Sequence, residues 1–113
     1  IAYASNSVTD NTAIITFNHV APTVNAGCSV IKSDGLGQYS PILTVKNGTS
    51  FVNVLSAVTE RWGDYSGIQR KYNEPDKLWM NGYYGYYTNS QRKHGTWIGE
   101  ISMALTSMPA SLK

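Results

Sequence analysis

Residues 60–101 form the stretch around which the chain is organised. The stretch begins with ERWGDYSG at residues 60–67 and ends with GTWIGEI at residues 95–101. It contains most of the eight tyrosines and all three tryptophans, which are Trp62, Trp79 and Trp97. Indole and phenol rings bring the largest apolar areas of any side chains, and their polar atoms need partners when buried. We therefore expect this stretch to be the packing centre, with the three tryptophans as structural residues.

The composition resembles that of all-β extracellular domains. The 113 residues are enough for one domain, of which 42% are hydrophobic and only 14% are charged. Many Thr, Val, Ile and Tyr residues with few charges favour strands over helices. The net charge of +2 is too small to indicate nucleic acid as a partner. No apolar run is long enough for a membrane span.

Cysteine and metal patterns are sparse. Cys28 is alone in the sequence, which excludes an internal disulfide, and we expect it to be a small buried hydrophobe. His19 and His94 have no second ligand at metal-binding spacing. The oxygen-rich turns at residues 10–11 and 34–37 could hold calcium, but neither repeats the EF-hand pattern. We expect no metal and no cofactor, and calcium has no specific motif to support it.

Strand signals in the first half are separated by turn residues. A short strand is expected within residues 1–5, and residues 13–18 alternate two faces in the manner of a strong strand. Residues 27–33 and 42–46 are further candidates. The Asn47-Gly48 dipeptide suits a two-residue hairpin because both residues tolerate positive φ, so we expect the strand at 42–46 to pair with residues 51–55.

The second half continues with extended segments and one clear turn. Only residues 56–61 suit a short helical turn. Pro75 presets φ for a β-turn at residues 73–76. The other expected elements are an extended segment at 62–70 broken by two glycines, strands at 77–84 and 96–105, and a polar loop at 88–95.

Short strands at this spacing indicate a sandwich, a barrel or a propeller. Residues 1–46 and 51–105 form a loose internal echo, in which each half would be a meander of three or four strands. We expect an all-β fold of antiparallel meanders that amount to about two blades of a β-propeller. The alternative is an immunoglobulin-like β-sandwich. The length of the chain fits this fold, but the sequence lacks its paired cysteines.

Arg61, Asp64 and Tyr65 are the first candidate ligand-binding residues. An arginine fork binds carboxylates, and a carboxylate can tune a neighbouring hydroxyl. Sialidases use a tyrosine nucleophile with a partner carboxylate in this way. The structural alternative is that Asp64 accepts backbone N–H groups in a turn while the rings pack. We assign no catalytic residue.

Tyr84 and Tyr86 are the second candidates, within a cluster at residues 83–87. Exposed tyrosines offer rigid amphipathic area to sugars or peptides. The alternative is a strand that places one ring inward and the next outward. Neither reading requires chemistry at these rings.

Five runs carry a resemblance to a known family. They read RWGDYSGIQ at 61–69, YNEP at 72–75, KLWM at 77–80, YYG at 83–85 and HGTWIGEI at 94–101. Together they resemble the last blades of secreted bacterial β-propellers, distant relatives of sialidase-like, BNR-type propellers found in large exported proteins of Bacteroidota. The similarity covers about 40 residues. A looser similarity to the preceding blade extends over residues 13–33.

The resemblance implies that residues 1–50 are penultimate-blade-like and residues 51–113 final-blade-like, together part of one larger domain. It also implies a secreted or cell-surface protein exported by type IX secretion. A true Asp-box reads Ser-x-Asp-x-Gly-x-Thr-Trp, and residues 33–37 lack both its spacing and its tryptophan. The arginine triad of sialidases has no counterpart, so the resemblance does not imply their activity.

A closed propeller needs about four or more blades, so two blades imply further protein. The expected partners are the remaining blades, supplied by another segment, by a cleaved chain or by copies of this chain, and a carbohydrate or surface protein as ligand. Because the chain begins at Ile1 rather than Met, we expect a processed product or a fragment. The expected function is a non-enzymatic scaffold or binding module. The alternative is a fragment of a secreted glycoside hydrolase or peptidase whose catalytic residues lie on other blades.

Overall fold

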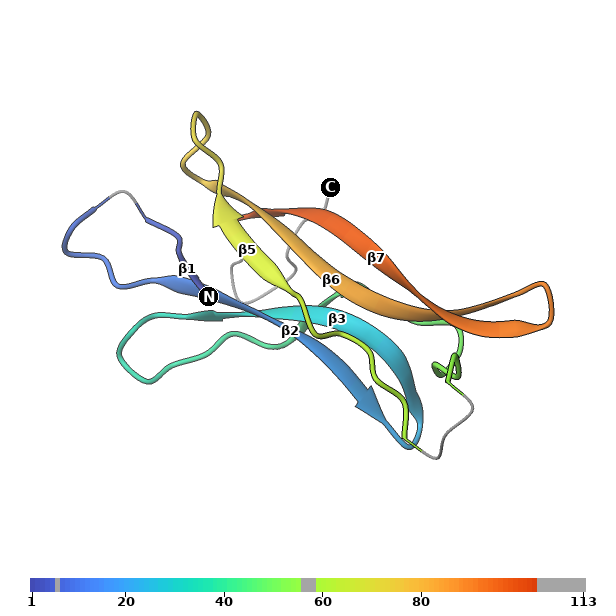
Figure 1. The fold of residues 1–113 in the computed structure, drawn as a ribbon. Helices are drawn as coiled ribbons and strands as arrows, with labels where there is room; N and C mark the ends of the chain where they lie inside the picture. The colour runs from blue at the N-terminus through green and yellow to red at the C-terminus, as the bar shows by residue number, and fades with distance from the viewer. Residues whose placement is uncertain (6, 56–58, 104–113) are drawn as a thin grey trace.

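The structure, a computed structural model, describes residues 1–5, 7–55 and 59–103 (Figure 1). These residues form strands and no helix, so the expectation of an all-β fold is confirmed. The strands are β1 (Ala2–Tyr3), β2 (Ala13–Ala21), β3 (Val24–Ser33), β4 (Leu43–Lys46), β5 (Gly67–Arg70), β6 (Lys77–Thr88) and β7 (Gln91–Ser102).

The strands make two antiparallel meanders. The first sheet has the order β1-β2-β3-β4 and the second has the order β5-β6-β7, with every neighbouring pair antiparallel. The internal echo of the sequence therefore corresponds to two sheets. In Figure 1 the second sheet lies across the first, and β6 packs against β3. Adjacent propeller blades and β-sandwiches share such face-to-face packing.

The core between the two sheets is aliphatic. Its members are Ala4, Ile14, Cys28, Val30, Leu78, Met80 and Ile101, all buried. On β6, Leu78 and Met80 alternate with the exposed Trp79, as a period of two requires. Cys28 is one of the core residues, so its expected role as a small buried hydrophobe is confirmed.

The expectation that the tryptophans form the packing centre is wrong. Trp79 is 46% exposed and Trp97 is 38% exposed, while Trp62 is half-buried. Trp79 lies between Leu78 and Met80, which both point into the core, so alternation turns its ring outward. Aromatic content located the sheet correctly, but Trp79 lies on its outer face, and Trp97, paired with Gly82, is only partly covered.

Glycine allows β3 and β6 to approach closely. A Cβ atom at Gly82 would lie 2.5 Å from Cβ and 2.8 Å from Sγ of Cys28. Carbon atoms in contact prefer separations of 3.5–4.0 Å, so no side chain fits at this position. An indole would be still less tolerable between sheets packed at this distance.

The predicted hairpin at Asn47-Gly48 is wrong. After β4 the chain crosses to the second sheet, where Thr49 N–H donates to the Gly85 carbonyl at 2.9 Å. Asn53 then forms an isolated bridge with Arg92 of β7. Gly48 packs against the backbone oxygens of Ala26 and Gly85, so the glycine serves close approach rather than a reversal of the chain.

The predicted polar loop at 88–95 is also wrong, because β6 and β7 continue through it. Only Asn89 and Ser90 lie between them, with φ of 48° and 60°, and Thr88 pairs with Gln91. Positive φ at both residues is the geometry of a two-residue hairpin turn. Serine rarely takes that conformation, which explains why the sequence did not predict it.

Three further expectations concern the turn at 73–76, the helical turn at 56–61 and the strand at 96–105. The β-turn expected at 73–76 lies one residue later, at 74–77, since Lys77 N–H donates to the Glu74 carbonyl at 3.0 Å. The helical turn expected at 56–61 includes residues 56–58, which lie outside the described residues, and residues 59–61 are not helical. The strand expected at 96–105 begins earlier, at Gln91, and its positions 104–105 also lie outside the described residues.

Candidate functional site

Arg61 and Asp64 form an exposed pair on the loop that precedes β5. The Arg61 Nε atom lies 2.6 Å from the Asp64 Oδ2 atom, and the Arg61 side chain is largely exposed. The ring of the neighbouring Tyr65 is exposed as well. Within the described residues, no hydrogen bond joins the Tyr65 hydroxyl to Asp64. An exposed ion pair of this kind contributes at most about 1 kcal/mol to stability.

Asn18 holds the loop beside β6. Its Nδ2 donates to the Gly63 carbonyl at 3.1 Å, and its Oδ1 accepts from the Tyr83 N–H at 2.9 Å. Asn81 Nδ2 adds a bond of 3.2 Å to the Tyr65 carbonyl. Sequence reasoning missed Asn18, because its partners lie 45 and 65 residues away along the chain.

Tyr84 and Tyr86 lie in a half-buried aromatic cluster with Trp97. The Tyr84 ring centre is 5.6 Å from that of Tyr86 and 6.2 Å from that of Trp97. The ammonium group of Lys46 lies 4.2 Å from the Trp97 ring centre and 5.0 Å from that of Tyr84. The rings are therefore occupied by one another and by a cation. No contact within the described residues joins this cluster to Arg61, Asp64 or Tyr65.

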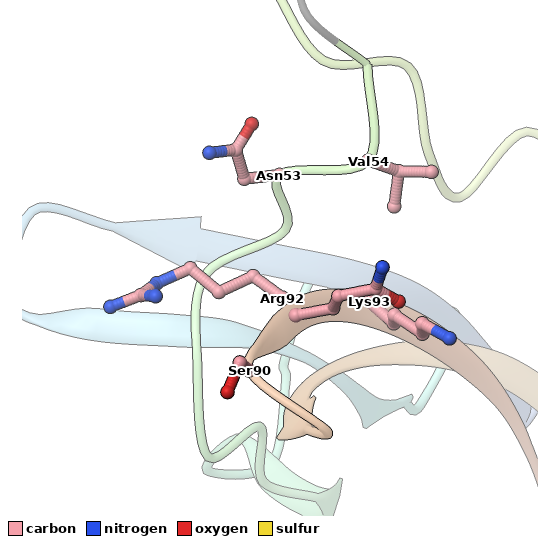
Figure 2. A pocket seen from close by; sticks show the side chains of 6 residues that line it. Asn53, Val54, Ser90, Arg92 and Lys93 are labelled. Atoms are coloured by element: carbon pink, nitrogen blue, oxygen red, sulfur yellow. The ribbon is translucent and has the colours of Figure 1, made fainter.

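A cleft of about 300 Å³ lies between residues 53–54, in the segment that runs from β4 to the second sheet, and the turn end of the β6–β7 hairpin (Figure 2). Arg92 lines it, with its guanidinium 4.4 Å from the Phe51 ring centre and 5.2 Å from that of Tyr87. Figure 2 shows the side chains of Arg92 and Lys93 extending in opposite directions. The two cations therefore do not converge on one position in the cleft. The Arg92 guanidinium joins Phe51, in the segment that follows β4, to Tyr87 of the hairpin.

The outer face of β5–β7 carries a shallow groove of about 510 Å³. We call it the Trp79 groove, and its lining residues are Gly67, Ile68, Gln69, Trp79, Met80, Asn81, Thr96 and Ile98. The sheet register sets this arrangement, because Gly67 pairs with Asn81, Gln69 with Trp79, and Asn81 with Ile98. Directly paired residues project from the same face of a sheet.

The groove combines one wide ring with flanking amides. Trp79 presents nearly half of its surface, Gln69 and Ile98 are exposed, and Gly67 leaves a floor without a side chain. A primary amide offers both donors and an acceptor. Asn81 commits its Nδ2 to the Tyr65 carbonyl, and this bond fixes the orientation of its amide. The arrangement can therefore hold a flat ligand that is apolar on one face and polar at its rim.

Four charged groups border the groove and neutralise one another. Lys71 Nζ lies 2.5 Å from Glu74 Oε1, 2.8 Å from Glu100 Oε2 and 5.1 Å from the Trp79 ring centre, while Lys77 also binds Glu74. Hydrogen bonds from Lys71 and Lys77 lower the pKa of Glu74 to about 2. The hydrogen bond to Glu100 is the main cause that raises the pKa of Lys71. Two cations and two anions leave the groove without net charge on this side.

Histidines and oxygen-rich turns are engaged structurally. His19 Nδ1 lies 2.9 Å from Ser29 Oγ, and Asp10 and Asp34 accept backbone N–H groups two residues on at 2.9 and 2.8 Å. In residues 1–5, 7–55 and 59–103, no three His, Cys, Asp or Glu side chains are grouped to hold a metal ion. The same part of the chain has no helix with the length and hydrophobicity needed to cross a membrane.

Sequence reasoning assigned Trp79 a structural role and missed its neighbours in the groove. Gln69, Asn81, Thr96 and Ile98 come from three strands and share no motif. The usable signal was the alternation around Leu78 and Met80, which faces Trp79 away from the core. The neighbours then follow only from the register between strands.

No protein-family model, curated protein or solved structure matches the chain.

Proposed function

We propose that the chain is a non-enzymatic, extracellular binding module that presents the Trp79 groove to a neutral carbohydrate. The observation that carries the proposal is the position of Trp79, 46% exposed on a sheet face, paired with Gln69 of β5 and two residues from Asn81 on β6. A buried Trp would be structural, whereas an exposed ring beside amide side chains is typical of a ligand contact.

The chemistry of a sugar ring fits this groove. A pyranose has a face of C–H groups and a rim of hydroxyls that both donate and accept hydrogen bonds. The indole offers a rigid apolar surface for the C–H face. The amides of Gln69 and Asn81 match the hydroxyl rim, because each carries donors and an acceptor. The paired charges of Lys71 and Glu100 favour a neutral ligand over an acidic one.

The proposal is non-enzymatic because the reactive side chains of the described residues do not converge. A nucleophile needs a base within hydrogen-bond reach. The Asp64 carboxylate is occupied by Arg61, and the Tyr65 hydroxyl does not bond to it. The aromatic cluster of Tyr84 and Tyr86 contains a cation but no acid.

The proposal places the module at the cell surface or outside the cell, as part of a larger propeller or assembly. One feature supports an assembly. The radius of gyration is 15.4 Å, whereas a compact chain of this length has about 13 Å.

Affinity electrophoresis tests the carbohydrate proposal. The chain is run in native gels containing hydroxyethyl cellulose, xylan or laminarin, and we expect at least one of these neutral polysaccharides to retard it. Trp79→Ala should strongly reduce that retardation, and Gln69→Ala should reduce it to a smaller extent. The matched control is Tyr72→Ala, which removes a fully exposed ring outside the groove and should leave retardation unchanged. Lack of retardation in all three gels, or equal retardation of Trp79→Ala, contradicts the proposal.

Light scattering on a sizing column tests the assembly proposal. We expect a native mass well above the 12.4 kDa of one chain, from copies or from co-purified polypeptides. A native mass equal to that of one chain would mean that the two sheets are stable alone. That result refutes the assembly while leaving the Trp79 groove untouched.

A further inference from the structure

A second cleft lies on the first sheet, where four paired residues form one row. Tyr3 pairs with Ala13, Ala13 pairs with Ser33, and Ser33 forms a bridge with Tyr39. The row therefore crosses β1, β2, β3 and the segment that follows β3. Ile14, next to Ala13, is completely buried in the core, so the row of Ala13 faces the opposite side of the sheet. We call this feature the Tyr3–Tyr39 cleft.

The row has a small floor and two aromatic walls. Ala13 and Ser33, in the middle, are only 5% and 8% exposed, whereas Tyr3 and Tyr39, at the ends, are 68% and 61% exposed. Neighbouring strands lie about 4.8 Å apart, so three spacings place the two tyrosine backbones about 14 Å from each other. Carbon atoms in contact are about 3.5–4.0 Å apart, so a sugar ring that enters between upright rings at that separation stacks on one tyrosine and leaves space beside the other. The cleft has a volume of about 530 Å³.

A rigid turn closes one end of the cleft. Gly35 has φ of 75°, and a Cβ atom there would lie 2.5 Å from Cβ of Asn11, so the turn packs directly on Asn11. Ser33 Oγ accepts from the Gly35 N–H at 3.1 Å, and Asp34 Oδ1 accepts from the Leu36 N–H at 2.8 Å. The turn is thereby held in place by two side-chain bonds.

Polar atoms are distributed where a sugar would need them. The Asn11 amide and the two tyrosine hydroxyls line the cleft together with the apolar side chains of Ile1 and Ile15. No charged side chain lines it. A neutral sugar with apolar ring faces and a hydroxylated rim matches an aromatic wall and these donors and acceptors.

We infer that the Tyr3–Tyr39 cleft is a second carbohydrate-binding site, which takes a neutral pyranose segment over its small floor, stacked on its tyrosines. The inference rests on the proposed function, because it assigns the same ligand class to a second place. The Trp79 groove is on the outer face of one sheet and the cleft is on the outer face of the other. One ring cannot occupy both, so a chain with both sites binds two sugar segments and can cross-link polysaccharide.

The test is a two-dimensional ¹⁵N–¹H NMR titration of the full chain with cellohexaose, xylohexaose and laminarihexaose. We expect at least one hexaose to shift the amide signals of Tyr3, Ala13 and Ser33 as well as those of Gln69 and Trp79. Tyr39→Ala should weaken binding at the cleft at least tenfold and leave the Trp79 groove unaffected. Trp79→Ala should do the reverse. Tyr39 is mostly exposed, so its substitution preserves the fold, and Tyr3→Ala provides a second variant.

The outcomes separate the two claims. Shifts at the Trp79 groove alone overturn the second site and leave the proposed function standing. Shifts at the cleft alone support the second site and refute the Trp79 groove. The absence of shifts with all three hexaoses overturns both. Shifts at Tyr3 and Ser33 that appear on concentrating the chain without sugar would assign the cleft to contact between copies, and would also overturn the inference.

Discussion

Replacing Gly82 with alanine tests the close approach of the two sheets. The added Cβ would lie 2.5 Å from Cβ of Cys28, 2.8 Å from its Sγ and 3.2 Å from Oδ1 of Asn18. Carbon atoms prefer about 3.5–4.0 Å, so β3 and β6 would have to separate by about 1 Å. Cys28 is fully buried and cannot swing aside.

The expected cost of Gly82→Ala is about 1–3 kcal/mol in the free energy of unfolding, which is the usual penalty for overpacking a core. Cys28→Gly removes both atoms that the new methyl group would strike. In that background the same alanine should cost at least about 1 kcal/mol less, because it then fills space that the first substitution opened. The cycle therefore isolates the contact between the strands from the general effect of adding a methyl group to β6.

Urea unfolding followed by tryptophan fluorescence measures all four members of the cycle. A slope of about 1–3 kcal/mol per molar urea converts the shifts of the midpoint into free energies. The reasoning is refuted if Gly82→Ala is harmless, or if it costs the same with Cys28 and with Gly at position 28. Either result would mean that the sheets do not meet at this point.

Three further predictions concern charge and access. The pKa of Glu74 is lowered from 4.5 to about 2, so its ionised carboxylate stabilises the folded chain above pH 4.5, and this contribution is lost as the pH falls towards 2. Over that pH range, the melting temperature should therefore fall more steeply in the parent chain than in Glu74→Gln. Equal slopes for the two chains would contradict this prediction. Asp64→Asn should change the free energy of unfolding by less than about 1 kcal/mol, because its partner Arg61 is exposed; a larger loss in urea unfolding would show that the pair is structural. Burial raises the pKa of the Cys28 thiol, so a thiol reagent such as 5,5′-dithiobis(2-nitrobenzoate) should modify it only in denaturant, and rapid modification of the native chain would place Cys28 at the surface.

The strands were predictable where their signal is local. Residues 13–18 alternate strongly and lie within β2, and Pro75 marks the turn before β6. The hairpin at Asn89-Ser90 was missed because its turn residues are unusual for that geometry. At Gly48 the sequence predicted a hairpin that the structure does not have. A glycine required for close contact between backbones cannot be told in sequence from one required for a turn.

The candidate site was less predictable than the strands. Arg61, Asp64 and Tyr65 are close in sequence and lie on one exposed loop, where no other candidate residue of the described part of the chain contacts them. Trp79 and Gln69, and likewise Tyr3 and Tyr39, become neighbours or opposite walls only through pairing between strands. A shift of register by one residue would turn each of these side chains to the other face.

The sequence by itself determined that the chain is all-β and divided into two meanders, because alternation and turn residues act over a few positions. The tertiary structure decided which face of each strand is covered. The space between β3 and β6 admits Gly82, Leu78 and Met80 but not an indole, so aliphatic side chains fill the core and Trp79 is left outside. The physical reason is that burial depends on the distance between two sheets, and no single strand encodes that distance.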